Sequence, residues 1–435
     1  MKKTIKLAVI AALALGTTSA FATNGDLMIG QGAKARSMGG TGIAKSFGSE
    51  SALVNPANIS SVKDMEATLA VTYFVPDVKL GSNAQANMSS GGVQTPITLG
   101  DSGSGTSIIP EVYFAAKVND KLTAGIAIAG TAGMGTDYTN AVTSGAFKMR
   151  TALSLLKVAV PVSYNINGGL TLGAAAVMQY GSLEMSHDTL SGNIDNGAST
   201  DIGYGYEVGL NYTNSGLTIG AVYKSAIAMS YKNTIGTSIA AFGGSGMTGI
   251  TSGDSLEQPE ERGIGIAYSM GSNTLTADYK NIAWGDAKGY SDFGWENQDV
   301  YALGYEYTGN SWAFRAGYNY AKSPIVEQDG SKGTVQPAQN YAGAVKNFFN
   351  LSGFPGIVET HYTIGGGYDI TEALTLDGSF IYVPEVSASF DTSGLTEGAV
   401  FMQTGNAGAA MGTAPSSADA THSQMALTIA ATYRF

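Results

Sequence analysis

Residues that could perform catalysis or bind a metal are few and widely spaced in this sequence. The chain has no Cys, and its three histidines are His187, His361 and His422. Zinc and other transition metals are normally held by several Cys, His or carboxylate ligands, two of them at a short fixed spacing. Serines are abundant, but none stands in a pattern that marks a nucleophile activated by a base. We therefore predict no catalytic residues, no metal site and no cofactor.

A phosphate-binding loop is also excluded. Gly30 and Gly32 have the spacing of the first two glycines of a dinucleotide fingerprint. However, Ala35 stands where the third glycine is required, and no strand precedes the pattern. The formal net charge of −11 argues against nucleic acid as a partner, because phosphate backbones are bound mainly by Lys and Arg.

The N-terminus has the form of a secretory signal. Three lysines precede an apolar run at residues 7–16, and an Ala-x-Ala cleavage site ends at Ala22. Residues 1–22 are therefore predicted to be a signal peptide, and loss of its lysines gives the mature chain a formal charge of about −14. No other stretch approaches the roughly 18 apolar residues of a transmembrane helix.

The mature chain has the composition and periodicity of a membrane β-barrel. Charged residues make up 13% of the chain, against about 25% in soluble domains, and Gly (59) and Tyr (23) are frequent. Apolar and small or polar residues alternate over stretches of about ten residues, as barrel strands require. In the final segment the outward set would be Met425, Leu427, Ile429, Ala431, Tyr433 and Phe435. We expect the carboxylates, including Asp299 and Glu306, to face only the lumen.

Fourteen segments follow this alternation. They are residues 66–79, 108–118, 121–133, 151–165, 169–185, 200–213, 216–231, 260–270, 273–285, 296–308, 311–323, 357–370, 373–388 and 422–435. Short turns rich in Asn, Asp and Gly follow the even-numbered segments, and longer loops follow the others. Short turns are periplasmic in bacterial barrels, which places both chain ends there. The predicted fold is all-β, a fourteen-stranded antiparallel transmembrane β-barrel at residues 66–435.

Residues 23–65 lack this alternation. A barrel of fourteen strands is too wide for wall side chains to fill. We therefore predict that this N-terminal segment, the hatch, folds into the lumen as a plug.

Several motifs resemble those of one known family. They are Asn24-Gly25, the run Gly-Ala-Lys-Ala-Arg-Ser-Met-Gly-Gly at 32–40, Asn55-Pro56-Ala57, the run 312–317 followed by Ser323-Pro324, and the closing Tyr433-Arg434-Phe435. In these motifs the chain resembles the FadL/TodX (OmpP1) family of outer-membrane transporters for long-chain fatty acids and other hydrophobic compounds. The Asn-Pro-Ala triplet is the most specific of them, and the resemblance covers essentially the whole mature chain.

The resemblance implies a mechanism as well as a fold. Extracellular loops capture the ligand, a hydrophobic pocket binds it, and it leaves sideways into the membrane when the hatch shifts. Asn55, Pro56 and Ala57 would be the hatch motif. An inward kink of the third strand would open the wall, and Gly130, Gly133 and Gly135 give that strand the freedom to bend.

The longer loops contain apolar patches. The candidate ligand contacts in these patches are Phe242, Met247, Phe348, Phe349 and Phe354. Soft Met and Phe surfaces suit greasy ligands of varied shape. The alternative is that these side chains only pack on one another and cap the barrel.

The substrate stays open at this level. Fatty acid transporters of the family are expected to hold the ligand carboxylate with basic residues, partly from the fifth strand, but residues 169–185 contain no Lys or Arg. The expected partners are therefore fatty acids or aromatic hydrocarbons, with outer-membrane lipid or detergent around the wall. A protein that releases ligand through its own wall needs no neighbour, so we expect a monomer. The alternatives are a general diffusion porin or a lipid-modifying outer-membrane enzyme.

Overall fold

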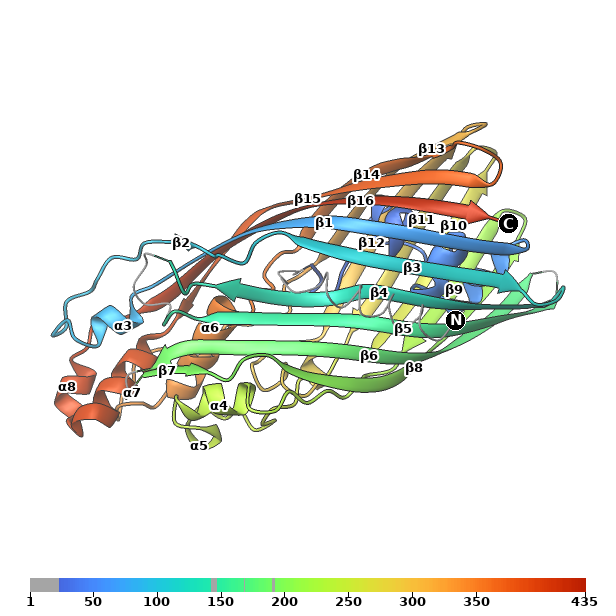
Figure 1. Ribbon diagram of the computed structural model, residues 1–435. Helices are drawn as coiled ribbons and strands as arrows, with labels where there is room; N and C mark the ends of the chain where they lie inside the picture. Colours follow the sequence, from blue (N-terminus) through green and yellow to red (C-terminus); the bar gives the residue numbers. More distant parts are fainter. Residues whose placement is uncertain (1–22, 142–146, 168, 190–191) are drawn as a thin grey trace.

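The computed structural model describes residues 23–141, 147–167, 169–189 and 192–435, so the predicted signal peptide lies outside the described residues. Sixteen strands form one antiparallel sheet (Figure 1). They are β1 (Met65–Ser82), β2 (Gly100–Asp101), β3 (Ser107–Lys117), β4 (Leu122–Asp137), β5 (Arg150–Asn167), β6 (Leu170–Thr189), β7 (Gly192–Asp195), β8 (Ser199–Asn214), β9 (Leu217–Lys224), β10 (Glu261–Met270), β11 (Asn273–Ile282), β12 (Gln298–Thr308), β13 (Trp312–Ala321), β14 (Thr360–Asp369), β15 (Leu374–Asp391) and β16 (Ser417–Arg434).

The sheet closes on itself. β1 pairs with β16 from Glu66–Arg434 to Ser82–Ala418, and every other neighbouring pair of wall strands is also antiparallel. β2 and β7 are short segments that pair only with β1 and β6. The remaining fourteen strands form the barrel wall, and the predicted strand number and fold class are confirmed.

The two ends of the barrel differ as the turn pattern predicts. Both the short turns and the C-terminus lie at one end (Figure 1). The long connections lie at the other end and carry most of the helices. Those helices are α3 (Ala84–Asn87), α4 (Ile235–Ala240), α5 (Ser245–Thr248), η3 (Trp284–Asp286), α6 (Tyr341–Gly353), α7 (Ser393–Thr404) and α8 (Ala407–Met411).

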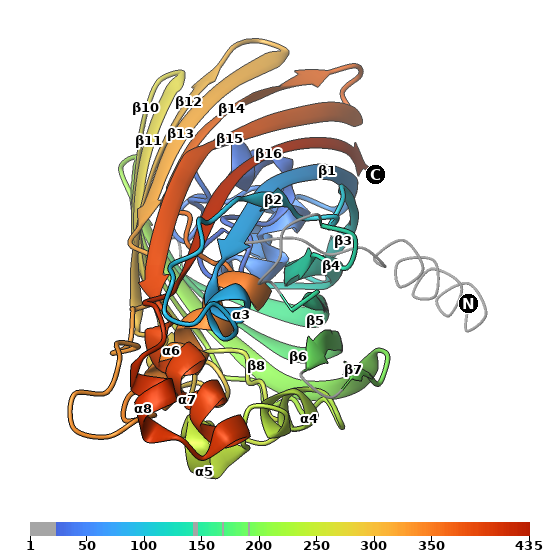
Figure 2. The same ribbon diagram turned by 90° about the vertical axis from the view of Figure 1, so that its left-hand side faces the viewer.

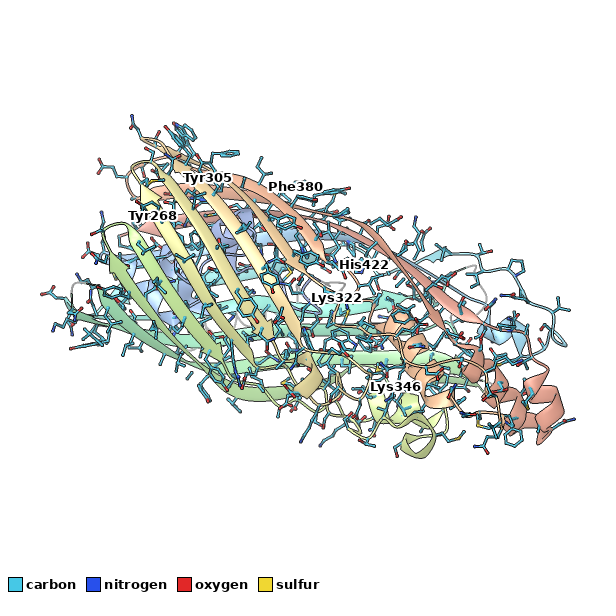
Figure 3. The ribbon with its side chains drawn as sticks, turned by 180° about the vertical axis from the view of Figure 1, so that it is seen from behind. Tyr268, Tyr305, Lys322, Lys346, Phe380 and His422 are labelled. Atoms are coloured by element: carbon cyan, nitrogen blue, oxygen red, sulfur yellow. The ribbon has the colours of Figure 1, made fainter. Side chains whose placement is uncertain are left out.

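Outward residues are apolar and inward residues are small or polar, as a barrel in lipid requires. Ile429 is 55% exposed, whereas its neighbours Thr428 and Ala430 are 0% and 1% exposed. Aromatic residues gather near the end with the short turns, where Tyr268 and Tyr305 lie (Figure 3). The expectation that carboxylates face only inward is wrong at Asp299, which is exposed on the outer face near the end of β12 that begins at Gln298.

The wall is taller on one side than on the other. β9 to β13 have 8 to 11 residues, close to the roughly 9–11 that cross a membrane, whereas β6 has 20. Figure 3 views the short side, and Lys346 lies there among the helices beyond the strand ends.

The prediction that the seventh strand reaches residue 231 is wrong. β9 ends at Lys224, and the following residues leave the wall and lie on its lumenal side. They fit there because the wall carries glycines: a Cβ at Gly203 would lie 2.5 Å from Ile227, and one at Gly181 would lie 2.1 Å from the Tyr231 hydroxyl. Residues 225–231 alternate like a strand but pack against the wall rather than within it.

The hatch lies inside the barrel (Figure 2). It contains helix α2 (Gly32–Ser37) and two 3-10 helices, η1 (Gly48–Leu53) and η2 (Pro56–Ser61), and it ends at Asp64, immediately before β1 begins at Met65. Among the helices of the described ranges, none combines the length and apolar character needed to cross a membrane.

Candidate functional site

The Asn55-Pro56-Ala57 motif holds one side of the hatch against the wall. The Asn55 side-chain oxygen accepts the N–H of Ala57 at 3.1 Å and so caps η2, while Pro56 stands in the first turn, where no N–H is needed. The Asn55 amide donates to the carbonyls of Ile43 at 2.7 Å and of Leu210 on β8 at 3.3 Å. The motif therefore joins two parts of the hatch to β8.

Glycines in the wall make this contact possible. A Cβ at Gly173 on β6 would lie 2.2 Å from the Ala57 nitrogen, and a Cβ at Gly209 on β8 would collide with the Asn55 side chain. Larger residues at either position would push the hatch away from the wall. The close contact thus depends both on the hatch motif and on the wall glycines.

Buried ion pairs hold the opposite side of the hatch. The Arg36 guanidinium pairs with Glu111 on β3, and neither side chain is exposed. Lys34 pairs with Glu50 of the hatch at 2.8 Å and with Asp377 on β15 at 3.5 Å. α2 is therefore tied to two separate parts of the wall.

The network of ion pairs continues along the lumenal face of the wall. Arg315 on β13 bridges Asp377 and Glu306, each at 2.7 Å, and Lys45 of the hatch reaches Glu306 at 2.9 Å. Buried ions without partners are costly, so charges of this kind keep their partners. This part of the hatch is held in place.

Loss of one buried partner should destabilise the protein strongly. We expect Arg36→Met to lower the free energy of unfolding by about 3–5 kcal/mol, because Glu111 is left as a buried, uncompensated charge. The measurement is urea unfolding of the purified protein. Arg262→Met is the matched control, since Arg262 pairs with Glu260 while 71% exposed and should change the free energy by about 1 kcal/mol or less. Equal losses in the two variants would contradict the assigned role of Arg36.

The third wall strand, β4, is bulged in the glycine-rich region. Its pairing with β5 shifts register between Gly130 and Ala132, so Thr131 is the extra residue. A bulge bends a strand and increases its twist. Gly133 and Gly135 follow within β4 and remain paired with β5.

β3 and β4 separate beyond this bulge. Their pairing ends at Glu111–Ala129, although β3 extends back to Ser107 and β4 continues to Asp137. We call the space between residues 107–110 and 130–137 the wall gap. Along the wall gap, β3 and β4 are neighbours in the barrel but are not paired with each other.

The first residues of the hatch occupy the β4 side of the wall gap. The Met28 N–H donates to the Thr131 carbonyl at 3.1 Å, and the Gly133 N–H donates to the Asp26 carbonyl at 3.0 Å. β5 occupies the other edge of β4 here, so the hatch lies on the edge that faces β3. We call residues 23–28 the latch.

The inner side of the wall gap is apolar. A Cβ at Gly130 would lie 2.5 Å from the Ile109 side chain, so the glycine lets Ile109 approach β4 closely. Ile109 is 2% exposed and belongs to a buried cluster with Met28 and Ile29 of the hatch. Hydrophobic side chains thus fill the place where the wall is unpaired.

A small cavity with a mixed polar and apolar lining lies between the hatch and the wall beside the wall gap. Its volume is ≈ 40 Å³, enough for about three waters at roughly 10–15 Å³ each. The charged residues in its lining are Lys157, Lys224, Lys280 and Glu261. Lys224 lies 3.6 Å from Glu261, whereas neither Lys157 nor Lys280 forms an ion pair with any residue in the described ranges. The lining of the cavity therefore contains three lysines and one glutamate, and the buried carboxylates of Glu207 and Asp278 also lie near these lysines.

Three of the five candidate ligand contacts come together at the mouth of the barrel. Phe242 packs against Phe349 with ring centroids 5.1 Å apart, and Phe348 lies beside both. All three are buried, as is Phe354. Met247 on α5 is 36% exposed. The loop residues thus pack together in this state, with Met247 at the surface.

The lumenal lysines are functional candidates that the sequence alone did not single out. The three lysines lie on three different strands, and only closure of the barrel brings these strands together. The alternation pattern could have identified them, because Lys157, Lys224 and Lys280 all stand at inward positions of their segments. Lys157 adjoins the bulge, since it pairs with Ala129 of β4.

Residues 10–333 match the sequence profile of the family described as outer membrane protein transport protein (OMPP1/FadL/TodX). The match spans more than half of the chain. The chain belongs to this family. OMPP1/FadL/TodX proteins reside in the outer membrane and transport compounds across it, which agrees with the barrel described above.

Individual relatives of this OMPP1/FadL/TodX protein are distant. It is 22% identical to outer membrane protein P1 of Haemophilus influenzae over 79% of this chain and 83% of that protein. It is 23% identical to a long-chain fatty acid transport protein of Escherichia coli, over 66% and 76% of the two chains. A 91-residue stretch is 36% identical to an uncharacterized protein of Chlorobium limicola, and it spans 20% of this chain and 45% of that one.

Solved structures share the fold of this OMPP1/FadL/TodX protein. The crystal structure of a Pseudomonas aeruginosa FadL homologue aligns with a TM-score of 0.65 at 16% identity, covering 94% of this chain and all of that one. The Pseudomonas putida toluene transporter TodX aligns with a TM-score of 0.62 at 17% identity, covering 95% and 100%.

Proposed function

We propose that this protein is a passive, monomeric channel that takes up hydrophobic compounds through the outer membrane without catalysis. The ligand enters through the loops, passes the hatch beside β4, and leaves sideways through the wall gap when the latch moves. The observation that carries this proposal is that the latch, and not β3, pairs with β4 beside the bulge.

The latch is suited to move because few bonds hold it to β4. Two backbone hydrogen bonds attach it to β4, whereas α2 is held by buried ion pairs. A ligand that occupies the apolar place of Met28 beside Ile109 regains the buried contacts that the latch loses, at roughly 25 cal/mol per Å² of apolar surface. No energy source is needed for this exchange.

Capture begins at the loops. Met247 offers a soft, partly exposed surface, and the loop residues Phe242, Phe348, Phe349 and Phe354 are buried. Aromatic and Met side chains adapt to apolar ligands of varied shape. In this proposal the phenylalanines part as the ligand passes inward.

The lumenal lysines favour a ligand with a carboxylate. Lys157 forms no ion pair within 4.0 Å among the described side chains, and it lies beside the bulge in a cavity whose lining contains three lysines and one glutamate. A carboxylate there would gain charge-assisted hydrogen bonds while its chain lies along the apolar wall gap. We therefore favour long-chain acids over neutral aromatics such as toluene, the compound named for TodX.

Uptake by a host that lacks its own fatty acid transporter tests this function. The chain is supplied in trans, and growth or uptake is measured with oleate and with toluene. Uptake of oleate supports the proposal, uptake of toluene alone assigns a neutral substrate, and uptake of neither overturns it. Steady ion conductance by the intact protein would instead identify a general porin.

Lys157 should contribute to the binding of ligands that carry a carboxylate and not to the binding of neutral ligands. We expect Lys157→Met to weaken oleate binding by about tenfold or more, the equivalent of one charge-assisted hydrogen bond, and to change binding of methyl oleate by less than about twofold. Equilibrium binding to the purified protein measures both. Lys63→Met, at an exposed hatch position, is the control and should leave both affinities unchanged. Equal losses for acid and ester would remove Lys157 from carboxylate recognition.

A further inference from the structure

The latch carries a buried carboxylate that the transport route does not use. Asp26 is 0% exposed. Its carboxylate accepts hydrogen bonds from the Tyr290 hydroxyl and, at 3.0 Å, from the Gln258 amide. Its second oxygen, Oδ1, has no partner within the part of the chain that the structure describes. An acid in this position is sensitive to protonation.

The latch is also fitted into an aromatic cluster of the extracellular loops. The Trp284 ring packs against the rings of Tyr290 and Trp295, with centroids 4.6 Å and 5.2 Å apart. Gly25 has φ +68°, and a Cβ there would lie 2.6 Å from the Trp284 ring. The indole therefore lies directly on the latch backbone.

Asp26 thus joins two structures that must separate for release. Its side chain binds Tyr290 and Gln258 of the loops, and its carbonyl accepts the Gly133 N–H of bulged β4. We propose that Asp26 is a proton-operated pin, which holds the latch closed when protonated and lets it leave the wall gap more readily when ionised.

The surroundings of Asp26 set the direction of this effect. Burial is the largest influence and raises the pKa of Asp26 from its ordinary 3.8 to about 6, although the hydrogen bonds from Tyr290 and Gln258 oppose it. The charged groups that face it are Lys157 of β5 and Glu261 of β10, which are opposite in sign. Tyr231 is the remaining titratable neighbour.

The sign follows from linkage. A released, hydrated Asp26 has the ordinary pKa, so the closed latch binds a proton more tightly than the released latch does. Closure is therefore favoured most below pH of about 4, and it weakens as the pH rises towards 6. The ratio of released to closed latch should rise by about tenfold between pH 5 and pH 7.5. The channel would then close in acid surroundings.

Tryptophan fluorescence can follow the latch without any substrate. In a Trp312→Phe background the remaining indoles are Trp284 and Trp295, both beside the latch. We expect their emission in the full mature chain to shift to longer wavelength as the pH rises from 4 to 7.5, because release lets water reach Trp284. We expect Asp26→Asn to abolish this shift and to keep the emission of the closed state at every pH.

Two further variants make the test specific. Asp64→Asn changes an exposed hatch carboxylate and should leave the shift intact. Tyr290→Phe removes a donor that stabilises the ionised form, so the midpoint should move to higher pH. A shift that persists in Asp26→Asn, or a midpoint that falls in Tyr290→Phe, would overturn the proposal.

The role of latch release in transport rests on the proposed function, but the expected fluorescence change does not. If the fluorescence follows these expectations while no hydrophobic compound is taken up, the pin stands and the transport proposal fails. If uptake occurs with no effect of Asp26→Asn on its pH profile, the pin fails and the transport proposal stands.

Discussion

Deletion of residues 23–60 is expected to turn a closed protein into an open pore. In planar bilayers the conductance should rise by more than about tenfold over that of the intact chain, because a wall of fourteen strands encloses a lumen that its own side chains cannot fill. The hatch fills this lumen through contacts that run from β8 to β15. Single-channel recording measures the change.

This result depends on a barrel that still closes. The β1–β16 pairing begins at Glu66 and does not involve the deleted residues, so the strand content measured by circular dichroism should be kept. A correctly folded deletion variant that conducts no better than the intact chain would mean that the extracellular helices, and not the hatch, block the lumen.

A disulfide between the latch and β4 is expected to stop transport. Leu27 and Ala132 face each other as an isolated antiparallel bridge, flanked by the two hydrogen bonds that join latch and strand. This is the non-hydrogen-bonded geometry, in which Cα atoms lie about 4.5 Å apart, and disulfides tolerate that separation. Leu27→Cys with Ala132→Cys should therefore cross-link on oxidation and lower ligand uptake by more than about tenfold.

The cross-link has simple controls because the natural chain has no Cys. Reduction should restore uptake by the double variant. The two single variants should transport at close to the normal rate under oxidising conditions, since both positions are buried and the side-chain changes are small. Full uptake by the oxidised, cross-linked protein would show that the latch does not have to leave β4.

The sequence predicted the barrel because a membrane wall imposes a local rule. Each strand must alternate apolar and polar residues, and each turn must be short at one end, so both signals can be read within about ten residues. β16 illustrates this, since all its predicted outward residues from Met425 to Ile429 are exposed. Local patterns were sufficient for the strand number, the turn positions and the location of the plug.

The alternation rule gave wrong predictions where apolar and polar residues alternate for a reason other than contact with lipid. Residues 225–231 alternate because one face packs on the glycines of β6 and β8, and no local signal distinguishes that surface from lipid. Asp299 faces outward near the strand end, where it accepts hydrogen bonds from Tyr279 and Asn281. Both errors arise at the extracellular side, where the wall leaves the uniform environment of the membrane.

The sequence by itself determined the fold class. Its resemblance to a family predicted the hatch motif Asn55-Pro56-Ala57 and a kink in the glycine-rich third strand, in which the structure has a bulge at Thr131. Only the tertiary structure decided which groups meet in the lumen. Lys157, Asp26 and Tyr290 lie far apart in the chain, and each appears alone in its own segment. These residues come together because closure of the sheet brings distant inward positions to face one another around the hatch. The spacing of residues along the sequence does not show which of these positions will be close in space.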